Sequence, residues 1–126
     1  IHDMINYLAN GDTKNTIFLL QSLFNVGVTT NQIIILTNKH FSLLHKLSLH
    51  KNNPNIILNK TYPPLYGHRR EQIIQHSNIW STKLTERALQ IILRLEEKLR
   101  TPSKVPLRSI LERSFLRISS FINKQV

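Results

Sequence analysis

The sequence TYPPLYGHRREQIIQHSNIWSTKLTERALQIILRLEEKLRT, residues 61–101, predicts a rigid lead-in followed by two helices. Pro63 and Pro64 each fix one φ angle, and a proline disfavours helix at the residue before it. The first of the two helices is therefore expected to begin near Leu65 or Tyr66.

The second helix of this stretch has the clearest apolar periodicity in the chain. Its apolar residues recur at the i, i+4 and i+7 positions of one helical face. They are Leu84, Ala88, Ile91, Ile92, Leu95 and Leu99. Ser81 is the expected N-cap, because its hydroxyl can accept a backbone N–H, and Pro102 should end the helix after Arg100. Trp80 should be at least half buried where the two helices connect.

The N-terminal half predicts three further helices. The first is short, with Asp3 as its cap, and it ends at residues 10–12, where Gly11 suits a left-handed conformation and Asp12 can cap the next helix. The second spans about residues 13–25, and apolar side chains around most of its circumference predict a deeply buried helix. Thr29, with Gln32 three residues on, forms a capping-box pattern for a third helix to about residue 50.

Prolines open the remaining helical segments. Pro54 can start a short turn through residue 58, and Pro106 can start the last helix, after which residues 123–126 should fray. Strand alternation, internal repeats and low-complexity tracts are absent. The prediction is an all-α protein in which residues 1–126 form one helical bundle of about five long and one or two short helices.

Length and composition limit the class of protein. The 126 residues suffice for one domain with a core. The absence of cysteine excludes a disulfide scaffold and fits a reducing compartment, so a cytoplasmic location is expected. No apolar run is long enough to span a bilayer. Because the first residue is Ile1 and not Met, the chain is interpreted as a fragment of a longer product.

The net charge of +10, from 17 Lys and Arg against 7 Asp and Glu, admits two explanations. A basic balance is typical of nucleic-acid binders. Plentiful isoleucine, asparagine and lysine are also typical of AT-rich coding, which raises the pI without any partner. Since residues 61–126 carry twelve of the basic residues, the basic surface is expected in the second half.

No motif for catalysis or cofactor binding stands out. The acidic residues form no pair at a spacing suited to acid–base chemistry, and three glycines provide no phosphate-binding loop. His40, His45 and His50 are each rotated by roughly 140° around a helix, so they share no face for a metal. The sequence therefore predicts no enzyme activity, no cofactor and no metal site.

The basic pair Arg69 and Arg70 is the candidate for phosphate contact. An ordinary solvated helix face is the alternative explanation for it. Trp80 is interpreted as a packed corner residue, with base stacking as its alternative role.

A set of features in order along the chain resembles the C-terminal domain of the δ subunit of bacterial DNA polymerase III, most closely its alphaproteobacterial versions. The features are Gly11-Asp12 before Leu19-Leu20, a long third helix with Phe41 and Leu44, Pro63-Pro64 followed by Arg69-Arg70, Trp80-Ser81 with Leu84 and Ala88-Leu89, and Arg100-Thr101 before Pro106. The resemblance covers nearly the whole chain. It rests on the order and spacing of these features taken together. Where the family often has a glycine after Arg-Thr, this chain has Pro102-Ser103, so the loop conformation there can differ.

The resemblance implies a non-catalytic collar domain of the clamp loader, the complex that loads the sliding clamp onto primed DNA during replication. Two AAA+-like domains would precede it, and the β clamp would be contacted by the missing N-terminal domain. The collar would bind the γ/τ and δ′ subunits. Primed DNA would bind only weakly, and no membrane would be involved. The alternative is a stand-alone basic helical domain that binds nucleic acid.

A collar domain must expose contact surfaces, and the outer sides of the last two long helices are the candidates. Arginine suits such surfaces because its planar guanidinium pairs with carboxylates and stacks on rings. The candidate residues are Arg87, Leu89 and Arg94 on one helix and Arg108, Arg113 and Arg117 on the other.

Overall fold

The computed structural model describes residues 1–62, 64–101 and 104–123, and every regular element among them is an α-helix. The all-α prediction is therefore confirmed. The roles expected of Pro63 and Pro102, the Pro102-Ser103 loop and the fraying of residues 124–126 lie outside the described residues.

Seven helices make up this part of the chain, five of them long and two short, as the sequence predicts. Their bounds are α1 His2–Ala9, α2 Thr13–Asn25, α3 Thr30–Leu49, α4 Pro54–Asn59, α5 His68–Ile79, α6 Thr82–Arg100 and α7 Leu107–Asn123.

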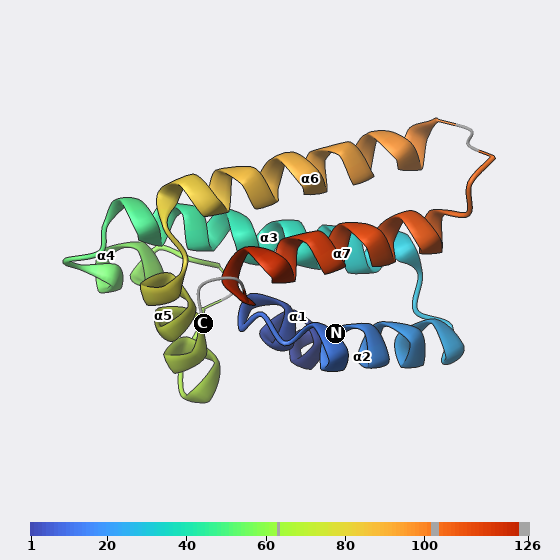
Figure 1. The fold of residues 1–126 in the computed structure, drawn as a ribbon. Coiled ribbons are helices and arrows are strands. Elements are labelled where there is room, and N and C mark those ends of the chain that lie inside the picture. The colour runs from blue at the N-terminus through green and yellow to red at the C-terminus, as the bar shows by residue number, and fades with distance from the viewer. Residues whose placement is uncertain (63, 102–103, 124–126) are drawn as a thin grey trace.

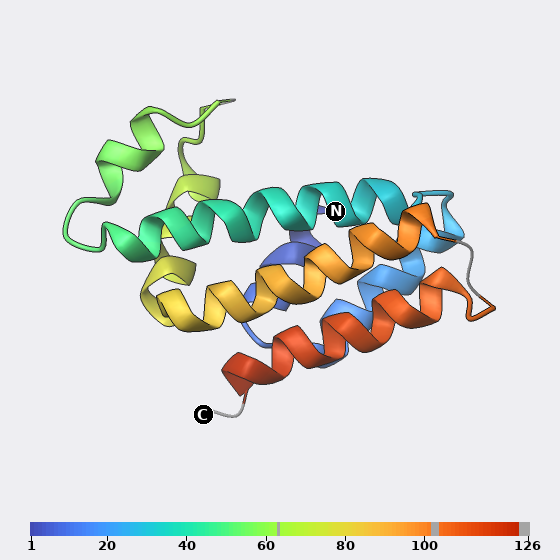
Figure 2. The same ribbon diagram turned by 90° about the horizontal axis from the view of Figure 1, so that it is seen from above.

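The long helices α2, α3, α6 and α7 run lengthwise through the molecule (Figure 1). Helix α3 packs on α6, α6 packs on α7, and α7 packs on α2. Seen from above, α3, α6 and α7 lie side by side (Figure 2). Helix α1 packs on α2, while α5 crosses one end of the bundle against α3, with α4 beyond it. The two ends of the bundle are therefore built differently.

Capping residues define three helix starts as the sequence predicts. The Asp12 carboxylate accepts the backbone N–H of Asn15, and the Ser81 hydroxyl accepts that of Leu84. Thr29 and Gln32 form both hydrogen bonds of a capping box. Each such cap satisfies backbone donors that the first turn of a helix would otherwise leave free.

Two helix starts differ from the prediction. Helix α5 begins at His68, two or three residues later than expected, because Gly67 precedes it with a φ of 65°, a conformation that ends any earlier turn. Asp3 does not cap α1: Ile1 holds the N-cap position, and Asp3 lies in the first turn, where its negative charge favours the helix dipole.

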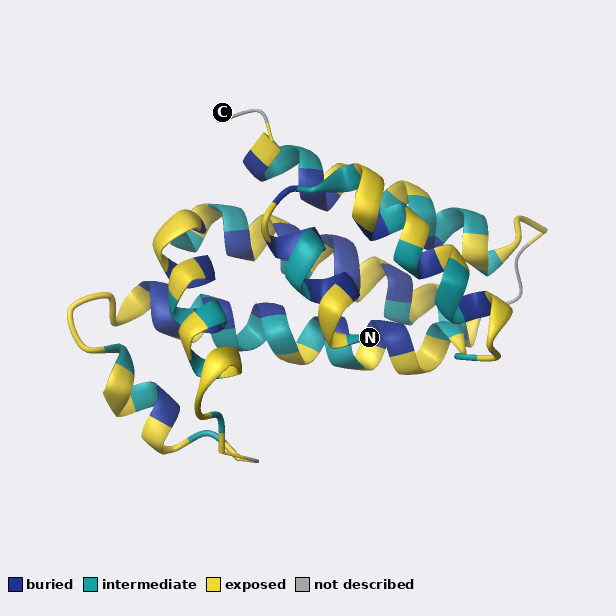
Figure 3. Cartoon of the chain, turned by 90° about the horizontal axis from the view of Figure 1, so that it is seen from below, coloured by how far each residue is buried: buried dark blue, intermediate teal, exposed yellow. Residues whose placement is uncertain are grey.

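Helix α2 is less deeply placed than its composition predicts. Its buried residues are Thr16, Leu20 and Phe24, whereas Phe18 is 66 % exposed. The helix packs mainly on α1 and α7, and its outer side faces solvent (Figure 3). The expectation of a deeply buried helix was wrong, because an apolar circumference does not fix how many neighbours a helix has.

Trp80 lies in the core, which confirms its predicted burial. The ring is fully buried, and it meets the Phe41 ring edge-on at a centroid distance of 4.9 Å. Its indole N–H donates to the Ala9 carbonyl over 2.8 Å. Trp80 thereby joins the α5–α6 corner to α3 and to the end of α1.

Candidate interaction surface

A shallow groove runs between α6 and α7, with a volume of about 210 Å³. Its apolar lining comes from Ile91, Leu95 and Ile110. Four cationic side chains complete it, Arg94 and Lys98 from α6 with Arg113 and Arg117 from α7, and no carboxylate contributes to the lining. We call these four residues and the groove they line the basic groove.

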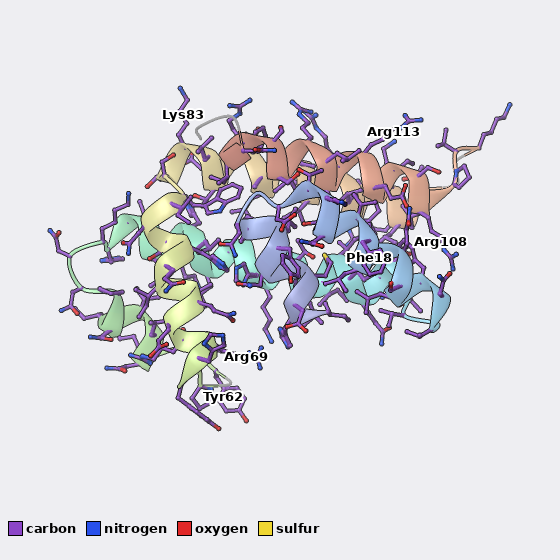
Figure 4. The ribbon with its side chains drawn as sticks, turned by 60° about the horizontal axis from the view of Figure 1, so that its bottom comes forward. Phe18, Tyr62, Arg69, Lys83, Arg108 and Arg113 are labelled. Atoms are coloured by element: carbon purple, nitrogen blue, oxygen red, sulfur yellow. The ribbon has the colours of Figure 1, made fainter. Side chains whose placement is uncertain are left out.

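Helical spacing explains why the four cations face each other. Arg94 and Lys98 are four residues apart on α6, and Arg113 and Arg117 are four apart on α7. Residues at this spacing share one helix face, so each pair lies along its own wall. Figure 4 shows Arg113 on the outer side of α7.

The cations of the basic groove have no counter-charge among the residues that the structure describes. Within residues 1–62, 64–101 and 104–123, no Lys or Arg forms an ion pair with Asp or Glu, and none of these four side chains donates a hydrogen bond. Like charges four residues apart destabilise a helix by roughly 0.2–0.5 kcal/mol per pair. An anionic partner would relieve this repulsion and add favourable contacts.

The other two predicted arginines lie on aromatic rings. The guanidinium carbon of Arg87 lies 4.6 Å from the centroid of the Phe121 ring on α7, and that of Arg108 lies 4.7 Å from the Phe24 ring on α2. These contacts tie neighbouring helices together. Leu89 is partly buried and packs against the core.

The structure thus brings together three of the six predicted interface residues, Arg94, Arg113 and Arg117. Lys98 was missed, although it follows Arg94 by four residues and was visible on the polar face of the same helix. Arg87 and Arg108 lie outside the groove lining, with their guanidinium groups over the rings of Phe121 and Phe24.

The candidate phosphate contacts Arg69 and Arg70 have different surroundings. Arg70 donates to the Leu65 carbonyl and to the side-chain oxygens of Asn55 and Asn59, at 3.1, 2.8 and 3.3 Å, so it ties α5 to α4. Arg69 is exposed, and its Nη2 lies 2.9 Å from each ring nitrogen of His2. Of the two, Arg69 is exposed, whereas Arg70 is partly buried.

A largely buried histidine pair, His40 and His76, joins α3 to α5. His40 Nε2 and His76 Nδ1 lie 3.3 Å apart, so one ring donates to the other. Burial lowers the pKa of His40 to about 3, with a smaller contribution from the charge of His76, and burial lowers the pKa of His76 to about 4. Both rings are therefore neutral at physiological pH. Their sequence separation gave no signal for this pairing.

Among the described residues, no three His, Cys, Asp or Glu side chains gather as metal ligands, and no helix has the length and apolarity needed to cross a bilayer. No protein-family model, curated protein or solved structure matches the chain.

Proposed function

We propose that this chain is the collar domain of the δ subunit of the bacterial DNA polymerase III clamp loader. The parent complex is a nucleotidyltransferase of the cytoplasm, and this domain is a non-catalytic module that holds subunits together. The observation that supports the proposal most is the basic groove, a surface of four cations without any counter-charge from the described residues.

The groove has the chemistry of a protein interface. Arginine is enriched at protein interfaces, and three of the four cations are arginines. Leu116 is 44 % exposed on α7 and lies three residues from Arg113, which places an apolar contact beside the charges. Protein–protein interfaces usually combine an apolar core with a surrounding rim of polar and charged contacts. We infer that the groove contacts an acidic face of γ/τ or δ′.

The chain should bind the C-terminal region of the γ/τ subunit from its own organism, and should not bind the β clamp. Affinity-tagged chain incubated with each purified subunit, at micromolar concentrations or above, tests this, because isolated collar contacts can be weak. Retention of the β clamp, or no retention of γ/τ and δ′ by folded chain, would contradict the collar assignment.

The double substitution Arg94→Glu/Arg113→Glu should weaken binding to γ/τ or δ′ at least tenfold, roughly 1.4 kcal/mol. Each change replaces attraction by repulsion on one wall of the groove. The matched control is Lys14→Glu/Lys83→Glu, which makes the same charge change at exposed residues outside the groove. Equal weakening by both double variants would show that net charge alone, and not the groove, determines binding.

A nucleic-acid partner is the second candidate, because the same four cations and the charge of +10 attract phosphate. As a collar domain, the chain should bind duplex and primed DNA weakly, without sequence preference and with a steep loss on adding salt. Fluorescence anisotropy at low and physiological salt measures this. Tight, sequence-selective binding at physiological salt would favour the stand-alone nucleic-acid-binding domain.

A further inference from the structure

A second and larger cavity lies at the other end of the bundle, away from the basic groove. Its volume is about 860 Å³, and α1, α3, α4, α5 and the connection from α4 to α5 all contribute to its lining. Helix α4 has only six residues and packs on α3, so it covers little of this end. Arg69 and Tyr62 lie together at the start of α5, beside this cavity, while Lys83 lies on the far side of the molecule (Figure 4).

The cavity has an aliphatic lining. Seven Ile and Leu side chains contribute to it: Ile5, Ile35, Leu36, Leu43, Ile57, Leu65 and Ile73. Tyr62 is the one Phe, Tyr or Trp residue among the lining residues, and its side chain is 87 % exposed. Such walls suit a flexible aliphatic body better than a planar base, which would require rings to stack on.

The charged side chains that line the cavity are all cationic. Lys39, Lys46, Lys60 and Arg69 contribute to the lining, and no Asp or Glu does. Within the part of the chain that the structure describes, the three lysines have neither an ion pair nor a side-chain hydrogen bond. Four cations beside an apolar lining attract a ligand with a negatively charged head.

Two polar features in the lining add fixed hydrogen-bonding positions. The Asn6 side-chain oxygen is buried and has no hydrogen-bond partner, and Asn6 contributes to the lining. This amide oxygen accepts hydrogen bonds, so it suits an O–H or N–H donor on the ligand, such as the hydroxyl of a monoprotonated phosphate head, and does not pair with an ionised carboxylate. The neutral His40–His76 pair also contributes to the lining and adds ring nitrogens without adding charge.

We propose that this cavity binds a small amphipathic anion, a molecule with an aliphatic body and a carboxylate or phosphate head. The aliphatic side chains take the body, and the lysines with Arg69 take the head. The volume falls within the range of about 300–1,000 Å³ that small-molecule sites occupy. The site is independent of the partner that binds the basic groove.

Isothermal titration of the chain with octanoate, octyl phosphate, octylammonium and 1-octanol, below any micelle concentration, tests the proposal. At least one of the two anions should bind, at least tenfold more tightly than octylammonium or octanol. The comparison of octanoate with octyl phosphate identifies the preferred head, and inorganic phosphate alone should bind more weakly than octyl phosphate. Binding of octylammonium as tight as that of the anions, or no anion binding at millimolar ligand, would overturn the proposal.

Variants locate the bound anion. Lys39→Gln/Lys60→Gln should weaken anion binding at least fivefold, while Lys14→Gln/Lys83→Gln removes the same charge outside the cavity and should leave binding within twofold. Backbone amide shifts in an NMR titration should concentrate on α3 and α5. Equal loss in both double variants, or shifts centred on α6 and α7, would show that the anion binds elsewhere and would overturn the site.

Discussion

Replacing Trp80 by alanine should lower the free energy of unfolding by about 3–5 kcal/mol, the range typical of large aromatic residues truncated in a core. The ring is fully buried and contacts Phe41 edge-on, so truncation leaves a cavity in the core. It also removes the donor that the Ala9 carbonyl uses, at 2.8 Å. Losses of that size remove much of the stability of a typical domain.

Urea unfolding followed by far-ultraviolet circular dichroism measures this loss without depending on the fluorescence of the only tryptophan. Trp80→Phe keeps a ring but loses the hydrogen bond to Ala9, so it should cost less than Trp80→Ala. The matched control is Tyr62→Ala, because Tyr62 is 87 % exposed and its loss should change stability by less than about 0.5 kcal/mol. A Trp80→Ala protein as stable as the parent would contradict the central role of this ring.

The sequence carried most of the secondary structure because its signals are local. The caps at Asp12, Thr29 and Ser81 and the apolar period of α6 depend on residues within one or two turns of each other. The predicted start of α5 was wrong because the backbone conformation of Gly67 sets where the helix begins. A glycine tolerates many conformations, so its φ of 65° could not be inferred from the neighbouring residues.

The burial of individual side chains in the packed bundle could be predicted less well than the helices themselves. The burial of Trp80 followed from its size and its position at a corner. The exposure of Phe18 could not be predicted, because it depends on which helices pack against α2. These are mainly α1 and α7, and Phe18 remains exposed.

The candidate site shows the same division. Arg94, Arg113 and Arg117 were identified from their place on polar helix faces, and Lys98 shares the spacing that groups them. Arg87 and Arg108 have the same residue type and exposed positions, but rings on other helices lie beneath them. The cavity at α3 and α5 had no sequence signal, because its lining comes from four helices and a connection.

Acid should destabilise the protein between about pH 6.5 and pH 4, beginning at a pH above that at which ordinary carboxylates, with pKa values near 4, titrate. Burial lowers the pKa of His40 to about 3 and that of His76 to about 4, while both side chains have ordinary values near 6.5 in the unfolded chain. Below pH 6.5 the unfolded chain therefore binds protons that the folded chain does not. As the pH is lowered, the free energy of unfolding therefore decreases by up to roughly 1.4 kcal/mol per pH unit for each histidine. The stabilisation from the neutral His76 is fully lost near pH 4.

Urea unfolding at half-unit steps from pH 7.5 to pH 4 measures this slope, and variants assign it. His76→Gln cannot take up a proton, so its slope between pH 6 and pH 4.5 should be shallower than that of the parent by about 1.4 kcal/mol per pH unit. His50→Gln is the matched control, because His50 is exposed and its replacement leaves the His40–His76 pair intact. A parent slope retained in His76→Gln would show that other groups cause the acid sensitivity. Because the test compares slopes, it holds even if His76→Gln is less stable than the parent at neutral pH.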